Sequence, residues 1–216
     1  MSEAIKVDIW SDVQCPWCYI GKRKFERAVA EFDGDVEVEY HSFELSPDTP
    51  LDFSGSPTEY LMRAKGLPRE QVEAMQARVS AIAASVGLDY DLEHAHQVNT
   101  VRAHQLIHYA KARGKQLEAK ERLLKAYFID SLNLGDLEVL ADLGAELGFE
   151  RDDVLRSLRE EEYLGAVRAD VAQAAAYGIH GVPFFVIDGK YGVSGAQESA
   201  TFLEVLETVR AERASA

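Results

Sequence analysis

The chain has 216 residues, 47% of them hydrophobic, and a formal net charge of −14 at pH 7. This length fits one or two compact domains with a sizeable core. The acidic balance argues against a nucleic-acid partner, because phosphate backbones are bound by clustered basic surfaces. No apolar run is long enough for a membrane-spanning helix, so we expect no membrane partner either.

The N-terminal segment predicts a strand, a helix and a second strand. Residues 5–10 are mostly apolar, and residues 16–31 have the periodicity of a helix. Residues 36–43 begin with apolar side chains that alternate with glutamates, which is typical of a half-buried strand. The sequence therefore opens with a β-α-β unit.

Both cysteines of the chain lie in Cys15-Pro16-Trp17-Cys18, between the first predicted strand and the first predicted helix. The thiolate is the reacting species in disulfide exchange, and the start of a helix stabilises negative charge. Pro16 suits the first helical position, because it has no N–H to leave unpaired. Cys18 follows one turn later, close enough to Cys15 for a disulfide. The pattern predicts a redox-active dithiol.

Two other interpretations of the cysteine pair stay open. The pair could be half of a zinc site, but the chain has no second cysteine pair. Zinc would then need histidines, either His94 and His96 or His104 and His108. The two cysteines could also be inert buried thiols. The strand-turn-helix context favours the redox interpretation, so we predict no metal site.

The first residues lead directly into the predicted strand, without the basic start and apolar stretch of a secretory signal. We therefore expect a cytoplasmic location. A single disulfide in a reducing compartment is expected to cycle rather than to act as a structural cross-link, which favours a catalytic role.

The middle of the chain predicts helices only. Residues 46–56 are rich in proline, aspartate and serine and predict a loop that leaves the sheet. Beyond this loop, no persuasive strand occurs before residue 160. Apolar residues at helical spacing predict one buried helix face, formed by Val72, Met75, Val79, Ile82 and Val86. Further helices are predicted over residues 98–112, 115–130, 136–147 and 151–160.

The C-terminal part returns to mixed structure. A helix is predicted over residues 163–177 and a strand over Phe184–Ile187. Asp188-Gly189 then predicts a hairpin turn into a strand at 190–194, and a last helix is predicted from Gly195. The order β-α-β, helical block, α-β-β-α indicates an α/β fold with a large all-helical insertion.

Several motifs together resemble a known family. The Cys-Pro-Trp-Cys motif, the Val182-Pro183 step before a strand and the split order of elements resemble the DsbA branch of the thioredoxin superfamily. Three segments are more specifically similar to the FrnE-like subfamily, namely residues 11–21, 43–47 and 178–186, and so is Asn99-Thr100 followed by His104. The resemblance implies a thioredoxin fold. Its domains would be a thioredoxin-like domain of residues 1–45 and 161–216, and a helical insertion of residues 46–160.

The resemblance also implies roles for individual residues. Cys15 is expected to be the exposed nucleophile that forms a mixed disulfide, and Cys18 the buried thiol that resolves it. Pro183 is expected to follow a cis peptide bond. The backbone of Val182 would then pair with an extended segment of the substrate.

The dipeptide between the cysteines is expected to contact the substrate and to influence the redox potential. Pro16-Trp17 supplies no positive charge, whereas DsbA has a histidine there that helps to keep its nucleophile ionised. We therefore expect this protein to be less oxidising than DsbA.

Other polar residues receive weaker assignments. In the subfamily, the positions of Asn99 and His104 face the active-site groove, although both side chains could simply form hydrogen bonds at a helix surface. Thioredoxins often place an acid behind the active site, near the end of the first strand. Strict spacing to Cys15 puts Ile9 at that position, and a shift by one residue puts Asp8 there. His180 precedes the Gly-Val-Pro step and is either near the site or a solvent-facing loop residue.

The resemblance implies a thiol-disulfide oxidoreductase or isomerase that acts on exposed cysteines of other proteins. The alternative is a glutathione-dependent isomerase or transferase of small aromatic or polyketide-like substrates, related to 2-hydroxychromene-2-carboxylate isomerase and kappa-class glutathione transferase. Those relatives usually carry serine at the position of Cys15, so two cysteines favour redox chemistry. A binding module that uses the same thiols is a third possibility. We expect no tightly bound cofactor, glutathione as a candidate co-substrate, and either a monomer or a homodimer.

Overall fold

The computed structural model of the protein describes residues 3–53 and 55–215. Its four strands form one sheet with the order β2-β1-β3-β4. They are β1 (Ile5–Ser11), β2 (Val36–Ser42), β3 (Phe184–Ile187) and β4 (Tyr191–Ser194). Strands β1 and β2 are parallel, whereas β3 pairs antiparallel with both β1 and β4. The expected domain ends at residues 1 and 216, and position 54 of the predicted loop, lie outside the described residues.

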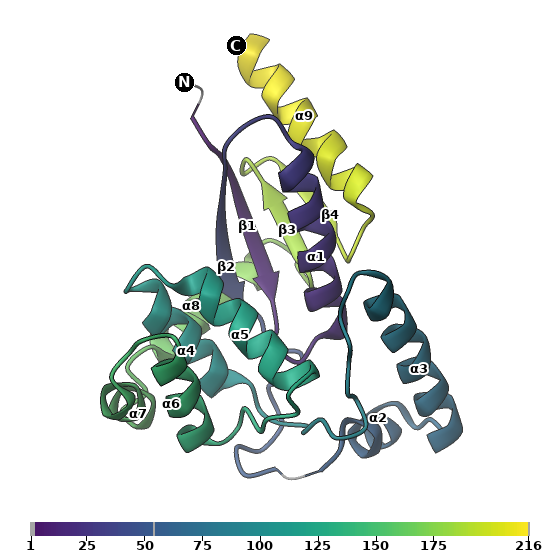
Figure 1. The fold of residues 1–216 in the computed structure, drawn as a ribbon, viewed down its shortest axis with the longest axis vertical. Helices are drawn as coiled ribbons and strands as arrows, with labels where there is room; N and C mark the ends of the chain where they lie inside the picture. Colours follow the sequence, from purple (N-terminus) through teal and green to yellow (C-terminus); the bar gives the residue numbers. More distant parts are fainter. Residues whose placement is uncertain (1–2, 54, 216) are drawn as a thin grey trace.

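Helices α1 (Pro16–Glu31) and α9 (Ser199–Ser215) pack side by side on one face of the sheet (Figure 1). Alternate residues of the strands point to that face, because successive side chains of a strand lie on opposite sides. They form an apolar cluster with Phe25 of α1 and Phe202 of α9. This cluster holds α1 in place, and the start of α1 carries the cysteine motif.

Seven helices lie between β2 and β3 in the described residues, 43–53 and 55–183. They are α2 (Pro57–Lys65), α3 (Arg69–Ser85), α4 (Val101–Lys111), α5 (Gln116–Phe128), α6 (Leu137–Glu146), α7 (Arg151–Arg159) and α8 (Leu164–Ala176). These helices gather at the end of the sheet where α1 begins, while both chain termini lie at the opposite end (Figure 1). Their main apolar cluster includes Tyr19 and Ile20 of α1. Because this core runs into the sheet domain, the division into two domains stays a prediction.

The order of elements confirms the predicted thioredoxin fold with its helical block. The hairpin is also confirmed: Asp188 and Gly189 have positive φ values of 58° and 64°, and Ile187 pairs with Tyr191. The start of the last helix is corrected. It begins at Ser199 rather than at Gly195, because Gly195 has a φ of 80° and donates its N–H to the carbonyl of Pro183.

Two details of the predicted helices also change. Met75 lies on the predicted buried face of α3 but is 44% exposed, and the buried residues of α3 are Val72 and Ala83. Helix α4 starts at Val101 rather than at residue 98. The side chain of Asn99, just before the helix, accepts the N–H of Val101. The following helices match the predicted ranges to within a few residues.

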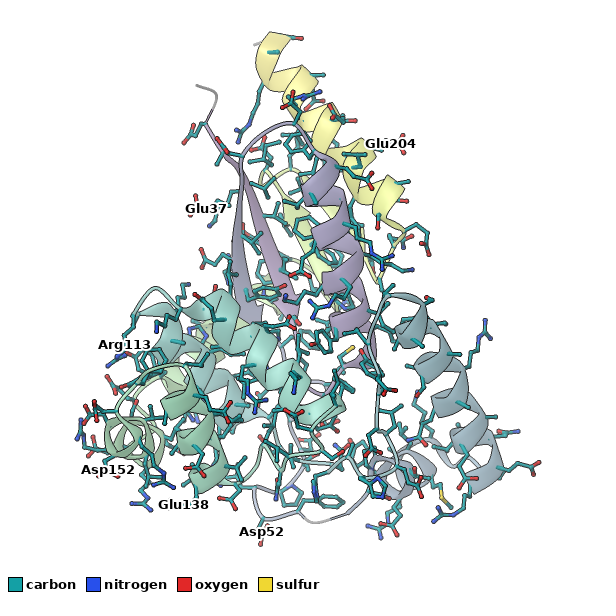
Figure 2. The ribbon with its side chains drawn as sticks, viewed as in Figure 1. Glu37, Asp52, Arg113, Glu138, Asp152 and Glu204 are labelled. Carbon is teal, nitrogen blue, oxygen red and sulfur yellow. The ribbon has the colours of Figure 1, made fainter. Side chains whose placement is uncertain are left out.

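The net negative charge is spread over the periphery. Charged side chains such as Glu37, Asp152 and Glu204 project outward from the body of the molecule (Figure 2). Within residues 3–53 and 55–215, no helix combines the length and the apolar character needed to cross a bilayer.

Candidate active site

The cysteine motif lies at the start of α1, as predicted. Cys15 has an extended backbone and directly precedes the helix, and Pro16 is the first helical residue. The backbone N–H of Cys18 donates to the carbonyl of Cys15 at 3.0 Å, which closes the first turn. The reactive positions are therefore set by local backbone geometry.

The cysteine motif contacts the segment around Pro183. The Val182–Pro183 peptide bond is cis, as expected. The thiol of Cys15 donates to the carbonyl oxygen of Val182 at 3.4 Å. A Cβ atom placed on Gly21 would lie 3.0 Å from Cγ of Pro183, so the glycine allows α1 to pack closely against the proline.

The expected exposure of Cys15 is wrong. Cys15 and Cys18 are each only 3% exposed, whereas Trp17 between them is 38% exposed. Cys15 is covered because its sulfur faces the backbone of Val182, and because Tyr90 donates its hydroxyl to the carbonyl of Pro16 at 2.8 Å. A substrate that reaches Cys15 must replace the contact with Val182, with Trp17 as the exposed side chain beside it.

The two cysteines are free thiols in this structure, and they share one ionisation. Hydrogen bonding to Cys18 and burial raise the pKa of Cys15 well above its ordinary value. Burial alone would also raise the pKa of Cys18, but the hydrogen bond from Cys15, the positive charge of Lys120 and a contact with Ser11 lower it. The two thiols therefore ionise as a pair, with the pKa of Cys15 raised and the pKa of Cys18 lowered.

The buried acid beside the thiols is Asp12, so both Ile9 and Asp8 were wrong candidates. Ile9 is a core residue, and Asp8 lies in a separate polar cluster described below. Asp12 is fully buried and accepts hydrogen bonds from the backbone N–H of Leu45 at 2.8 Å and from His104 at 3.3 Å. Burial alone would raise the pKa of Asp12, but these partners, His104 first, lower it, so the carboxyl group is ionised.

A second buried charge comes from the inserted helices. Lys120 of α5 is 1% exposed, and its ammonium lies 5.5 Å from the ring centre of Tyr40. Burial lowers the pKa of Lys120 to about 8, against the attraction of Cys18, Asp12 and Cys15. Sequence reasoning missed the burial of Lys120, because a lysine in an amphipathic helix is usually on the solvated face.

His104 and Asn99 have different surroundings. His104 is 1% exposed and contacts the active-site loop through Asp12. Asn99 is 8% exposed and donates to the carbonyls of Thr49 at 2.7 Å and Pro47 at 3.2 Å, which fixes the loop after β2. A role of either side chain in substrate binding stays a prediction.

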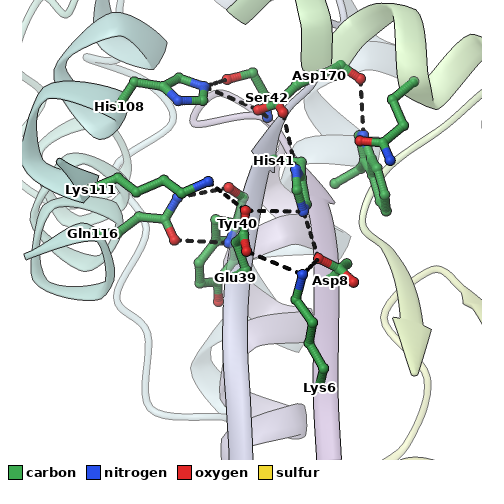
Figure 3. Close-up of polar contacts among 12 residues, drawn as sticks. Lys6, Asp8, Glu39, Tyr40, His41, Ser42, His108, Lys111, Gln116 and Asp170 are labelled. Carbon is green, nitrogen blue, oxygen red and sulfur yellow. Dashed lines mark hydrogen bonds and ion pairs between the residues drawn. The ribbon is translucent and has the colours of Figure 1, made fainter. Parts of the chain in front are cut away.

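A second buried polar cluster, which we call the polar junction, consists of Asp8, His41, Ser42, His108 and Asp170 (Figure 3). It connects β1 and β2 with α4 and α8. The ring nitrogens of His41 lie 2.8 Å from Asp8 Oδ1 and 3.0 Å from Asp170 Oδ1. The second oxygen of Asp170 accepts the N–H of Ser42 at 2.7 Å and lies 3.0 Å from His108 Nε2.

The polar junction is charged. Both ring nitrogens of His41 face carboxylate oxygens, which only accept hydrogen bonds, so both nitrogens carry protons. Burial alone would lower the pKa of His41, but its bonds to Asp170 and Asp8 raise it. Burial alone would raise the pKa of Asp170, but His108, His41 and the N–H of Ser42 lower it strongly.

Side chains with metal-ligating spacing do not include the cysteines. In the part of the chain that the structure describes, Asp8, Glu39 and His41 form such a group, and neither Cys15 nor Cys18 belongs to it. The two carboxylates of this group already pair with Lys6 and Lys111. His180, for which the sequence left open a position near the site or a solvent-facing loop, is exposed in its loop.

The fold and the site together define a thioredoxin-fold protein with a helical insertion. They combine a thioredoxin-type sheet, a dithiol at the start of a helix and a cis-proline beside the dithiol. Residues 6–207 match the family described as a DSBA-like thioredoxin domain, and the chain belongs to this family. The crystal structure of the probable DsbA oxidoreductase SCO1869 from Streptomyces coelicolor is 38% identical in sequence, with a TM-score of 0.91. That match covers 96% of this chain and 91% of the other.

Two more distant structures share the fold. The cytosolic disulfide reductase DsbM from Pseudomonas aeruginosa is 20% identical, with a TM-score of 0.65 over 94% of this chain and 97% of that chain. A 2-hydroxychromene-2-carboxylate isomerase is 13% identical, with a TM-score of 0.74 over 97% of this chain and 98% of that chain. At this level of identity the likeness concerns the fold alone.

Proposed function

We propose that the protein is a thiol-disulfide oxidoreductase that exchanges disulfides with other proteins, with Cys15 as the nucleophile and Cys18 as the resolving thiol. The observation that carries this proposal is the pair of thiols at the start of α1, with the Cys15 sulfur against the carbonyl of Val182. The SCO1869 protein, which is 38% identical to this chain, is described as a probable DsbA oxidoreductase and supports the same chemistry.

The exchange takes place in two steps. Once the substrate has replaced the contact with Val182, Cys15 gives its proton to solvent and attacks one sulfur of the substrate disulfide as a thiolate. One half of the substrate leaves as a thiolate, and the other half stays bound to Cys15. Cys18 then loses its proton and attacks the Cys15 sulfur, which forms the Cys15–Cys18 disulfide and releases the second half as a thiolate. The substrate disulfide is reduced, and the dithiol is oxidised.

Substrate binding follows from the same geometry. An extended segment that pairs with the backbone of Val182 replaces the thiol contact and brings its disulfide to Cys15. Pro16 and the exposed ring of Trp17 provide an apolar contact beside the sulfur. This mode requires only backbone and apolar contacts, which fits a range of protein substrates.

We further propose a cytoplasmic location and net reduction rather than oxidation. DsbM, which shares the fold, is described as a cytosolic disulfide reductase. The Pro16-Trp17 dipeptide adds no positive charge beside Cys15, which favours a less oxidising dithiol than that of DsbA. A redox titration with glutathione measures this directly, and a potential at or above that of DsbA contradicts it.

A glutathione-dependent activity on small molecules is the second candidate, because the fold is shared with 2-hydroxychromene-2-carboxylate isomerase. Both candidates use Cys15, but they differ in what Cys15 captures. The first candidate includes two finer proposals: that the protein also isomerises protein disulfides, and that it is a member of the FrnE-like subfamily.

The deciding experiment is trapping with Cys18→Ser. This variant keeps Cys15 but lacks the thiol that releases the substrate, so covalent complexes should accumulate. Cytoplasmic proteins held as mixed disulfides support the first candidate, whereas capture of glutathione alone supports the second. Wild type should reduce insulin, and Cys15→Ser should not; equal rates for the two would refute the first candidate.

A further inference from the structure

Three lysines of the chain are buried, and one of them differs from the other two. Lys22 pairs with Glu26 and Glu121, and Lys24 pairs with Glu198. Lys120 is the most buried of the three, at 1% exposed, yet within residues 3–53 and 55–215 it takes part in no ion pair with a carboxylate. Because a buried ammonium is costly without a counter-charge, another group must balance Lys120.

The position of Lys120 is fixed by the residue one turn before it. The side-chain amide of Gln116 accepts the backbone N–H of Tyr40 at 3.0 Å and donates to the carbonyl of Tyr40 at 2.8 Å. These two bonds fasten α5 to β2 as a neighbouring strand would. Lys120 then lies over the ring of Tyr40, on the inner side of α5, with its ammonium 5.5 Å from the ring centre. Among the negative groups that oppose the effect of burial on its pKa, Cys18 has the largest effect, ahead of Asp12 and Cys15.

Asp12 is less available as a counter-charge. One of its oxygens faces the N–H of Gln14 and His104, and the other accepts the N–H of Leu45. Cys18, in contrast, is the dithiol sulfur whose pKa is lowered, and the charge of Lys120 contributes to that lowering. The cluster therefore places one unpaired cation beside one acidic thiol.

We propose that Lys120 is a positioning residue for the resolving step: its ammonium stabilises the thiolate of Cys18 and so speeds the release of substrate held on Cys15. This inference rests on the proposed function. In the mixed disulfide, the Cys18 thiol gives its proton to solvent or to the fraction of Lys120 that is a neutral amine. The Cys18 thiolate attacks Cys15, the bond from Cys15 to the substrate sulfur breaks, and the substrate leaves as a thiolate. The inserted helix α5 thus supplies a charge on which the thioredoxin-like part depends.

The test compares Lys120→Met with Lys111→Met, which removes a lysine that pairs with Glu39 away from the thiols. The first readout is thiolate absorbance at 240 nm during a pH titration of the reduced protein. Loss of the opposite charge should move the first thiol ionisation of Lys120→Met upward by about one pH unit or more. Lys111→Met should titrate like wild type, and Lys120→Arg should keep most of the wild-type behaviour.

The second readout is the rate at which a preformed mixed disulfide between Cys15 and a peptide thiol is resolved, measured in a single turnover across pH. Lys120→Met should resolve it roughly tenfold more slowly near neutrality, and the difference should shrink at alkaline pH, because more Cys18 is then ionised. If Lys120→Met does not fold, Lys120→Gln replaces it. Unchanged titration and resolution in the folded variant overturn the inference. The absorbance titration needs no substrate, so it tests Lys120 even if the wild type proves inactive in disulfide exchange.

Discussion

Two buried polar clusters lie at the same end of the sheet, and they differ in how completely their charges are paired. In the polar junction, both oxygens of Asp170 receive hydrogen bonds, and both ring nitrogens of His41 face carboxylates. In the active-site cluster, Lys120 has no carboxylate partner among the described residues, and the pKa values of the two thiols are shifted in opposite directions. A fully paired cluster stabilises one arrangement, whereas an incompletely paired one can change its protonation during a reaction.

Helix α4 belongs to both clusters. His104 contacts Asp12 beside the thiols, and His108, one turn later, contacts Asp170 in the polar junction. The inserted helices therefore do more than cover the end of the sheet. Through α4 they hold the loop before Cys15, and through α5 they place Lys120.

Asp170→Ala should produce the largest loss of stability, because it leaves His41, His108 and a backbone N–H without their shared acceptor. Removing one partner of a buried ion pair typically costs about 3–5 kcal/mol, and we expect a loss of this size in the free energy of unfolding. Urea denaturation followed by circular dichroism measures it. Asp142→Ala, which removes a surface partner of Arg151, should cost under about 1 kcal/mol.

The same variant separates the two clusters. If the polar junction is structural, folded Asp170→Ala should titrate its thiols as wild type does. A large shift of the thiol ionisation with little loss of stability would show that the two clusters act as one, against the distinction drawn here.

Gln116→Ala should have a smaller effect on stability but a specific effect on the site. It leaves the buried N–H and C=O of Tyr40 unpaired, for an expected loss of about 2 kcal/mol. It also loosens the attachment of α5, so the thiol ionisation should move in the same direction as in Lys120→Met. Gln173→Ala is the matched control, because Gln173 is exposed and bonds only to the hydroxyl of Tyr177. Stability loss without any change in the thiol titration would mean that Gln116 does not place Lys120.

Much of the fold and the position of the dithiol followed from local sequence patterns. The strand and helix periods, the proline after Cys15 and the Asp188-Gly189 turn each act within a few residues, so sequence alone could locate them. The cis peptide bond before Pro183 came from the family resemblance rather than from any local preference.

The parts that sequence reasoning missed depend on contacts between distant segments. His104 meets Asp12 across 92 residues, and Gln116 meets Tyr40 across 76 residues. No periodicity distinguishes Lys120 from a solvated lysine, since its burial depends on where α5 docks. The burial of Cys15 likewise depends on Val182, which is 167 residues away in the chain. These positions become visible only when the helices are packed.

The smallest of the expected effects is a pH dependence of stability that comes from the polar junction. The pKa of His41 is raised in the folded protein, so its contribution is complete below the unfolded value of about 6.5 and is lost as pH rises through the folded value. The pKa of Asp170 is lowered, so its contribution is present above its unfolded value of about 3.9 and is lost at lower pH. The junction should therefore stabilise the fold most between roughly pH 4 and 6.5.

Unfolding by urea at pH 5.5 and at pH 8.5, in wild type and in His41→Gln, measures this contribution. The stability difference between the two proteins should be larger at pH 5.5, and smaller overall than the loss caused by Asp170→Ala. Trp10 stacks on the His41 ring with 4.4 Å between ring centres, so its fluorescence reports the state of His41 once Trp17→Phe removes the other tryptophan. If the difference between the proteins is the same at both pH values, His41 is uncharged in the folded protein, and the junction is held by neutral hydrogen bonds instead.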